Sequence, residues 1–182
     1  MKIVPARLPL AGKLLFQEKQ VFRQLPFLLL PGLLQILFLW GFIQQVIFDK
    51  PWGTRPSGDM ALVLINLGNL LIIFFLLNIV LDLRITDLGI SFRMRPLHWR
   101  WRNIVWTEIQ SARIIKYDGI RDYLGYGMRY SRKRGWCYTI SGPDGLELKS
   151  GRQERLLIGT HQGKKLQKTL GDLQANGEIN KI

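Results

Sequence analysis

The stretch LPFLLLPGLLQILFLWGFIQQVIF, at residues 25–48, contains no charged side chain. A second uncharged stretch, MALVLINLGNLLIIFFLLNIVL, covers residues 60–81. A hydrocarbon core of about 30 Å takes about 20 residues of helix, so each stretch is long enough to cross a bilayer. Neither has the polar stripe of a helix that lies on a soluble core. The two stretches therefore predict a transmembrane hairpin over residues 25–81, with a connecting loop at 49–59.

Buried core helices and a cleaved signal peptide are the alternatives to this hairpin. A chain of 182 residues leaves too little protein to surround two helices that are apolar on every side. A signal peptide has an apolar region of about 7 to 15 residues close to its start. The first stretch here begins at Leu25 and is longer. We therefore expect both stretches to remain in the mature protein.

Uncharged amide side chains interrupt the two apolar stretches, at Gln35, Gln44, Gln45, Asn66, Asn69 and Asn78. In hydrocarbon such groups find hydrogen-bond partners on a neighbouring helix. We expect them to pack within the hairpin or within a homo-oligomer. A transport pathway is the alternative, but neither stretch contains the Asp, Glu, Lys, Arg or His that such a pathway needs.

Basic residues flank the hairpin unevenly. Residues 1–24 contain five basic residues and one acidic residue, and residues 82–182 contain 19 and ten, whereas the loop at 49–59 contains two of each. Basic segments stay on the cytoplasmic side of a membrane. The counts predict a multi-pass protein of the cell inner (plasma) membrane with both termini cytoplasmic. The single cysteine, Cys137, suits that reducing compartment.

Residues 82–182 have the pattern of short strands followed by one helix, after a basic N-terminal segment at residues 1–24. Two strands at 83–86 and 90–94 flank the turn residues Asp87-Leu88-Gly89. Further strands are predicted from alternation at 97–102, at 108–117, on both sides of a turn at 131–135, at 146–149 and at 155–158, with a turn at 150–152. Leu166, Leu170 and Leu173 recur at helical spacing. We expect six or seven antiparallel strands and a C-terminal α-helix.

Six strings occur in order along the chain: F-x-E-x-x-x-F-R-Q at residues 16–24, G-I-S-F-R-M-R-P-x-H at 89–98, W-x-E-I at 106–109, K-Y-x-x-I-R-x-Y-x-G-Y-G-M-R-Y at 116–130, Y-x-I-S-G-x-x-G-L-E-L at 138–148 and L-I-G-T at 157–160. Their order and spacing resemble the bacterial pleckstrin-homology-like (PH-like) membrane proteins. The resemblance implies a membrane α-helical hairpin followed by a mainly antiparallel β barrel or sandwich that a C-terminal α-helix closes. It implies no catalytic residues.

Motifs for catalysis, metals and nucleotides are incomplete. Residues 159–165 have three residues between their glycines where a phosphate-binding loop has four, so a strand-to-helix turn capped by Thr160 explains them better. Gly125-Tyr126-Gly127 lacks the third glycine of a dinucleotide motif and suits a turn that lets tyrosines pack. Neither His98 nor His161 has cysteine or carboxylate partners in its pattern. We expect no enzyme, no catalytic residue, no metal site and no cofactor.

Basic side chains have the strongest claim to a function, because each one near an anionic leaflet contributes on the order of 1 kcal/mol of attraction. A solvated surface is the other interpretation. The candidates for contact with anionic lipid, without recognition of one headgroup, are Arg93, Arg95, Arg100, Arg102, Arg129, Arg132, Lys133 and Arg134.

These features together predict a membrane-anchored interaction module. The hairpin holds a PH-like domain at the inner leaflet, where the domain contacts lipids and an exposed strand edge or loop recruits a partner protein. A tethered nucleic-acid-binding protein is one alternative, suggested by the interleaved aromatic and basic residues of HWRWRNIVW at 98–106. We expect no nucleic acid, because the anchor already accounts for the charge. A small membrane enzyme is the other alternative.

Overall fold

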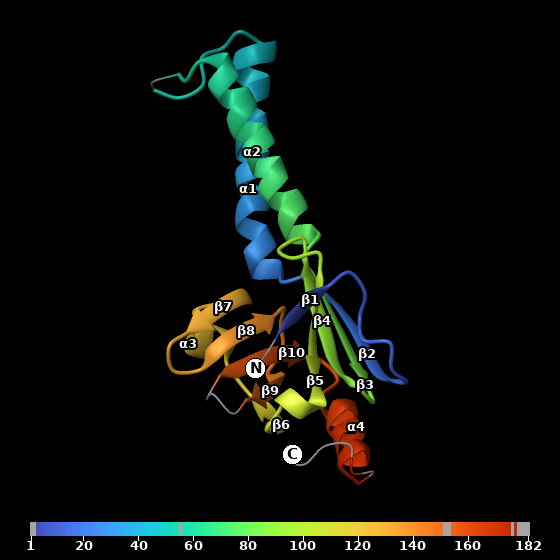
Figure 1. The fold of residues 1–182 in the computed structure, drawn as a ribbon. Helices are drawn as coiled ribbons and strands as arrows, with labels where there is room; N and C mark the ends of the chain where they lie inside the picture. Colours follow the sequence, from blue (N-terminus) through green and yellow to red (C-terminus); the bar gives the residue numbers. More distant parts are fainter. Residues whose placement is uncertain (1–2, 55, 151–153, 176, 178–182) are drawn as a thin grey trace. The chain divides into compact units, whose positions relative to one another are not determined.

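The computed structural model describes residues 3–54, 56–150, 154–175 and 177 of the chain. The chain folds into two compact units (Figure 1). Phe22–Asn78 form a helical unit, whereas Met1–Val21 and Ile79–Ile182 together form a β-sheet unit. The helical unit is therefore an insertion into the sequence of the β-sheet unit.

The helical unit is a hairpin of two apolar helices, α1 (Leu25–Phe42) and α2 (Asp59–Leu77), and α1 continues into a π-helical segment, η1 (Ile43–Ile47). Both helices are long and apolar enough to cross a membrane. The predicted second stretch, 60–81, is too long at its end, because strand β3 already begins at Val80. Hydropathy does not distinguish the helix from this strand, since Ile79 and Leu81 are apolar residues buried in the protein.

The β-sheet unit contains two five-stranded sheets. Sheet 1 has the order β1-β5-β4-β3-β2 and consists of β1 (Val4–Ala6), β2 (Leu14–Val21), β3 (Val80–Thr86), β4 (Gly89–Arg95) and β5 (Trp101–Val105). Sheet 2 has the order β6-β9-β10-β8-β7 and consists of β6 (Ser111–Lys116), β7 (Gly127–Ser131), β8 (Gly135–Thr139), β9 (Asp144–Lys149) and β10 (Arg155–Thr160). The helices of this unit are η2 (Trp106–Glu108), α3 (Gly119–Tyr123) and α4 (Gly163–Ala175).

The strands pair antiparallel, with one exception that the sequence analysis did not anticipate, since β8 and β10 run parallel. The predicted hairpin around residues 87–89 is confirmed as β3 and β4, which pair from Thr86 and Gly89 outward. The strand expected at 97–102 begins only at Trp101. The turn expected at 150–152 falls largely outside the described residues. Among the described strands, neither sheet closes into a barrel.

The N-terminal segment differs from its prediction. Residues 1–24 were expected to form a basic segment outside the domain, but they contribute β1 and β2 to sheet 1. Phe16, Glu18 and Gln20 are the buried residues of β2. Because two of these three inward positions are polar, β2 lacks the apolar alternation by which a half-buried strand is identified from sequence.

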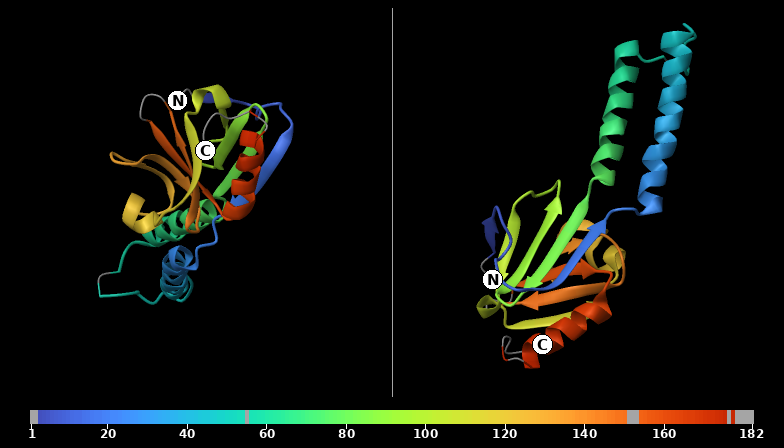
Figure 2. Two further views of the ribbon diagram at one scale, coloured as in Figure 1. Left: turned by 90° about the horizontal axis from the view of Figure 1, so that it is seen from below. Right: turned by 90° about the vertical axis from the view of Figure 1, so that its right-hand side faces the viewer.

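The core lies between the two sheets, whose strands run in different directions (Figure 2). Sheet 1 contributes alternate residues such as Leu83 and Phe92, and sheet 2 contributes residues such as Leu148 and Tyr138, all with no exposed surface. The rings of Phe92 and Tyr138 meet across the two sheets with centroids 5.0 Å apart. α4 packs against β2, β6 and β9 through its buried leucines, Leu166, Leu170 and Leu173, which confirms the predicted helix.

Candidate functional site

The two helices of the hairpin have their polar and apolar residues in the reverse of the usual arrangement. The buried residues are Gly41 in α1, and Leu62, Asn66 and Asn69 in α2. Most of the large apolar side chains of both helices are exposed. A helix on a soluble core buries its apolar face and exposes its polar one. The hairpin instead has the pattern expected of helices whose outer surface meets hydrocarbon.

Amide side chains join the two helices, as the sequence analysis expected for packing within the hairpin. The Nε2 of Gln35 donates to the Oδ1 of Asn66 at 2.9 Å. The Nδ2 of Asn69 donates to the Oε1 of Gln35 and to the carbonyl of Pro31, each at 2.9 Å. Asn66 also donates to the carbonyl of Phe38 at 3.1 Å. These bonds satisfy amides that would otherwise be costly in hydrocarbon.

Two of the amides, those of Gln45 and Asn78, form their hydrogen bonds outside this group. Gln45 bonds the loop between the helices, where its Nε2 donates to the Oδ1 of Asp59 at 2.8 Å and its Oε1 accepts from the backbone N–H of Trp52. Asn78 donates to the carbonyl of Phe74 in its own helix. The loop folds back on α1, where the ring of Trp52 lies so close to Gly41 that a Cβ there would collide with it.

The eight basic residues proposed for lipid contact do not form one cluster. Arg93 and Arg95 lie on β4 and share Asp82 of β3, whose Oδ2 is 2.7 Å from the Nε of Arg93 and 3.3 Å from the Nη2 of Arg95. Arg93 also lies over the ring of Trp101, 4.4 Å from its centroid, and Arg84 lies over the same ring at 5.1 Å. Both proposed arginines therefore have partners within sheet 1.

The contacts of Arg84 and Arg93 with Trp101 change how the string HWRWRNIVW at 98–106 is interpreted. Trp101 is 4% exposed and Trp106 is 7% exposed, so neither offers an open ring face. Among the aromatic residues of the string, only Trp99 is exposed. The alternation that suggested a stacking platform for nucleic acid instead places Trp101 between two arginines of its own sheet.

Arg102, on β5, contacts a buried aromatic group between the sheets. Its Nη1 donates to the hydroxyl of Tyr138 at 2.5 Å, and its guanidinium lies 5.3 Å from the centre of that ring. The ring of His98 is 5.5 Å from Tyr138 and 6.2 Å from Phe92. Burial lowers the pKa of His98, and the positive charge of Arg102 lowers it further. His98 is thus a neutral packing residue at neutral pH.

Four of the five remaining residues lie on the hairpin of β7 and β8, whose turn falls at 131–135 as predicted. The Nη1 of Arg134 is 2.8 Å from the Oδ2 of Asp122, and the Nε of Arg129 donates to the carbonyl of Tyr126 at 3.4 Å. Arg132 and Lys133 are exposed and, within the described part of the chain, form no ion pair. Arg100, in the loop before β5, is also exposed and forms no ion pair with any residue that the structure describes. Of the eight proposed residues, these three have side chains that form no ion pair, hydrogen bond or ring contact within the described part of the chain, and we call their charges uncommitted.

The tyrosines around Gly125-Tyr126-Gly127 pack in separate places. Tyr123 is buried against Tyr117 and Cys137. Burial raises the pKa of the Tyr123 hydroxyl to about 12 and that of the Cys137 thiol to about 12. Tyr130 packs instead against Trp136 across the β7–β8 pair, with tilted rings whose centroids are 5.2 Å apart.

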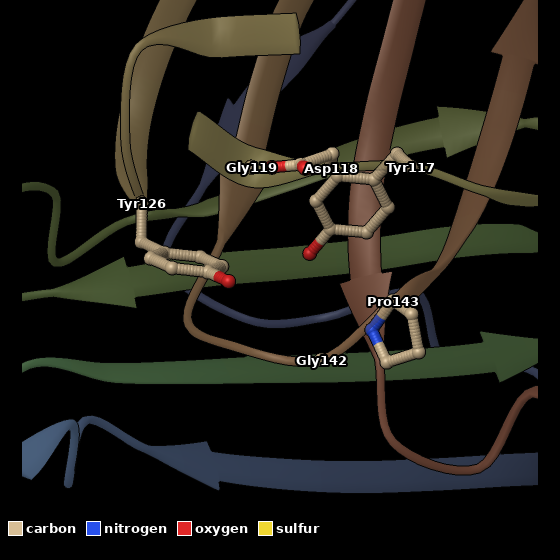
Figure 3. Close-up of a pocket in the computed structure, with 6 residues that line it drawn as sticks. All are labelled: Tyr117, Asp118, Gly119, Tyr126, Gly142 and Pro143. Atoms are coloured by element: carbon tan, nitrogen blue, oxygen red, sulfur yellow. The ribbon is translucent and has the colours of Figure 1, made fainter. Parts of the chain in front are cut away.

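A shallow cavity of about 370 Å³ lies beside α3, and its lining residues are Tyr117, Asp118, Gly119, Tyr126, Gly142 and Pro143. Figure 3 shows the hydroxyls of Tyr117 and Tyr126 pointing toward each other. Burial raises the pKa of Tyr117, whose hydroxyl has no hydrogen-bond partner of good geometry although Thr139 lies near it. Asp118 is occupied, because its Oδ1 accepts from the backbone N–H groups of Ile120 and Arg121, which lower its pKa. The cavity has room for a small molecule.

Ser141 and His161 form an arrangement that resembles a nucleophile with its base, since the Oγ of Ser141 is 2.6 Å from the Nε2 of His161. A catalytic pair also needs a group that orients the imidazole. The carboxylate of Glu18 is used elsewhere in this turn, accepting from the backbone N–H of His161 at 2.8 Å and from the hydroxyl of Thr160 at 2.5 Å. The geometry is that of a turn held in place by its side chains.

This turn explains the polar inner face of β2. Glu18 and Gln20 reach from β2 to the end of β10, where the Nε2 of Gln20 donates to the carbonyl of Gly159 at 2.7 Å. The Oγ1 of Thr160 accepts from the backbone N–H of Gln162 at 3.0 Å. The predicted cap by Thr160 is wrong, because α4 begins only at Gly163, so this bond stabilises the turn that precedes the helix. Among the described residues, no group of three or more His, Cys, Asp or Glu side chains could hold a metal ion.

Comparison of the chain with family models, with curated proteins and with solved structures finds no match.

Proposed function

We propose that the chain is an integral membrane protein whose helical hairpin holds a PH-like interaction domain at the inner leaflet of the plasma membrane, where the domain recruits a partner protein. One observation carries the proposal. The hairpin exposes apolar side chains and buries its amides between the helices. Water disfavours such a surface and hydrocarbon favours it.

The strand pairing supports the proposed orientation. β2 and β3 pair as far as Val21 and Val80, and the helical unit lies between these two residues in sequence. Both ends of a hairpin inserted in this way must emerge on the same side of the membrane. Outside the loop at 49–59, the chain carries 24 of its 26 basic residues on that side. The positive-inside rule makes it the cytoplasmic side.

The edges of the sheets support a role in binding proteins. α4 packs beside β2 and β6, which are edge strands of sheets 1 and 2. The opposite edges are β1, which has three residues, and β7, which has five. An exposed strand edge can accept an extended segment of another protein through main-chain hydrogen bonds. We propose β7 as the edge that does so.

Alkaline extraction and cysteine labelling test the membrane assignment. The full chain should stay in the membrane pellet at alkaline pH. In intact cells an impermeant maleimide should label Gly53→Cys in the loop and should label Gln167→Cys on α4 only after the cells are opened. Recovery of the chain in the supernatant would exclude the anchor, and labelling of Gln167→Cys in intact cells would reverse the orientation.

Photo-crosslinking in native membranes tests recruitment. A photoreactive amino acid at Arg129 of β7 should give a discrete crosslinked product. The same group at Lys168 of α4, which is also exposed to solvent, should not. Products at both positions, or at neither, would argue against a partner at the β7 edge.

A further inference from the structure

We propose that a group of exposed aromatic residues on the β-sheet unit lies in the lipid–water interface of the membrane that α1 and α2 cross. The group consists of Trp99, Tyr130 and Trp136, and we call these three residues together with the exposed Leu97 the aromatic ridge. The inference rests on the proposed membrane anchor. It assigns the ridge to the bilayer surface and leaves the β7 edge to a protein partner.

Ring contacts join two members of the ridge, Tyr130 and Trp136, to the buried Tyr138 and through it to His98. Tyr130 packs against Trp136 with tilted rings at 5.2 Å, Trp136 stacks on Tyr138 at 6.4 Å with 25° between the rings, and Tyr138 meets His98 at 5.5 Å. His98 lies between Leu97 and Trp99. The buried ring of Tyr138 therefore connects the β7–β8 part of the ridge with the loop before β5 that carries Leu97 and Trp99.

The ridge is unusually exposed for such large side chains. Trp99 is 69% exposed, Tyr130 62%, Trp136 43% and Leu97 42%. Clustered exposed apolar side chains mark a site that another surface covers. Trp and Tyr are enriched where membrane meets water, because one end of each ring system is apolar and the other can hydrogen-bond.

The charges beside the ridge match an anionic leaflet. Arg100 follows Trp99 directly, and Arg132 and Lys133 lie in the turn between Tyr130 and Trp136. These are the three proposed lipid-contact residues that keep an uncommitted charge within the described chain. Cationic groups next to interfacial aromatics are attracted to anionic lipid, and salt weakens that attraction.

The loop that contains Leu97 and Trp99 is connected to α2 by a short stretch of chain and by the pairing of β3 with β4. Val80 follows the last helical residue, Leu77, by three residues, and three peptide steps extend at most about 11 Å. Val80 pairs with Arg95, the last residue of β4. The loop that contains Leu97 and Trp99 leaves β4 at that point, and the backbone N–H of His98 is bonded to the carbonyl of Met94 at 2.8 Å. A lipid surface is therefore within reach of this loop whenever α2 is inserted.

Fluorescent labels on the full chain in lipid vesicles test the proposal. Trp99→Cys and Trp136→Cys would each carry an environment-sensitive dye, with Gln167→Cys on α4 as the exposed control and Ile72→Cys in α2 as the membrane control. The parent chain is the labelling blank, because Cys137 is fully buried and burial raises the pKa of its thiol to about 12. The vesicles contain phosphatidylcholine and phosphatidylglycerol.

Labels at 99 and 136 should emit at shorter wavelength than the label at 167, lose intensity to nitroxide lipids and be shielded from iodide. Behaviour like that of the label at 167 would overturn the proposal. Shielding from both quenchers would also overturn it, since a protein or a second copy would then cover the ridge. A label at 72 that nitroxide lipids fail to quench would instead refute the membrane anchor.

A charge variant tests the role of the flanking residues. The triple variant Arg100→Gln, Arg132→Gln and Lys133→Gln should reduce quenching of the label at 136 by nitroxide lipids and remove its dependence on salt. The matched variant with Lys164, Lys165 and Lys168 of α4 changed to Gln should behave as the parent does. Equal losses in both variants would mean that net charge alone attracts the domain, which would overturn the assignment to these three residues.

Discussion

Glu18 shows how one residue can hold the β-sheet unit together. Its carboxylate is 4% exposed and accepts hydrogen bonds from the hydroxyl of Thr160 and from the backbone N–H of His161, more than 140 positions later in the chain. Bonds to a buried charged group contribute more than bonds between neutral groups, and their loss leaves the donors unsatisfied. β2 therefore depends on a polar contact that hydropathy does not reveal.

We expect Glu18→Ala to lower the free energy of unfolding of the β-sheet unit by about 2–3 kcal/mol, because two buried donors lose their acceptor. Chemical unfolding of the full chain in detergent, followed by tryptophan fluorescence, measures this change. Gln17→Ala, at the exposed neighbouring position of β2, is the matched control and should change the free energy by less than about 0.5 kcal/mol. Equal effects at both positions would show that residues 14–21 are not part of the folded unit.

His98 should make stability depend on pH. Its pKa in the folded chain lies below the ordinary value of 6.5 because of burial and of Arg102. The unfolded chain therefore binds the proton at higher pH, so the contribution of His98 to stability is present above pH 6.5 and is lost as the pH falls through the folded pKa. As the pH is lowered from neutral to mildly acidic, the unfolding midpoint of the unmodified chain should decrease.

His98→Phe keeps a ring against Phe92 and Tyr138 but cannot be protonated, so its midpoints should fall less steeply. His161→Gln is the control and should keep the slope of the parent, because His161 is exposed. A slope that is unchanged in His98→Phe would assign the acid sensitivity to other groups.

At the level of elements, α4 was predicted from its leucines and can be tested through them. Leu170 is fully buried against the sheets, whereas the next residue, Gly171, is exposed and a Cβ there would meet no atom within 4 Å. Leu170→Ala should lower the free energy of unfolding by about 2–5 kcal/mol by leaving a cavity. Gly171→Ala should raise it by about 0.5–1 kcal/mol, since alanine favours a helix interior.

Unfolding curves of the two variants measure these opposite changes on adjacent residues. Changes of the same sign in the free energy of unfolding of both variants would mean that α4 does not pack against the sheets through Leu170.

Elements with apolar inward faces could be predicted from the sequence, and those with polar inward faces could not. β3 and β4 alternate Leu83 and Ile85, and Ile90 and Phe92, with outward polar residues, and the hairpin was expected where it lies. β2 turns Glu18 and Gln20 inward and was missed. α3 has five residues, too few to show a helical period.

The sequence shows which residues of the candidate site are charged, but it does not show which contacts they form. The sequence shows eight basic residues, yet the partners of Arg93 and Arg95 depend on the register that places Asp82 opposite Arg93. Arg134 pairs with Asp122, which lies 12 positions earlier and across the β7–β8 hairpin. Only the folded chain shows that Arg100, Arg132 and Lys133 remain uncommitted and that aromatic side chains lie beside them.

For the whole molecule, the account treats the hairpin of α1 and α2 as an insertion between two paired strands of one domain. Sequence analysis divided the chain linearly, into an N-terminal segment, a hairpin at 25–81 and a domain at 82–182. The structure takes β1 and β2 from before the hairpin and joins them to the strands after it. A hairpin inserted in this way is joined to the β-sheet unit through two chain connections instead of one.

Removal of the helical unit tests this organisation most directly. Val21 and Val80 are paired, so an Asn-Gly turn can join them in place of residues 22–79. The measurement is thermal unfolding followed by circular dichroism, on this joined protein and on residues 82–182 alone. The account predicts a soluble joined protein with a β-rich spectrum and a cooperative transition, and no such transition for residues 82–182, which lack β1, β2 and the start of β3. A joined protein that does not fold, or a fragment 82–182 that unfolds as cooperatively as the joined protein, would contradict it.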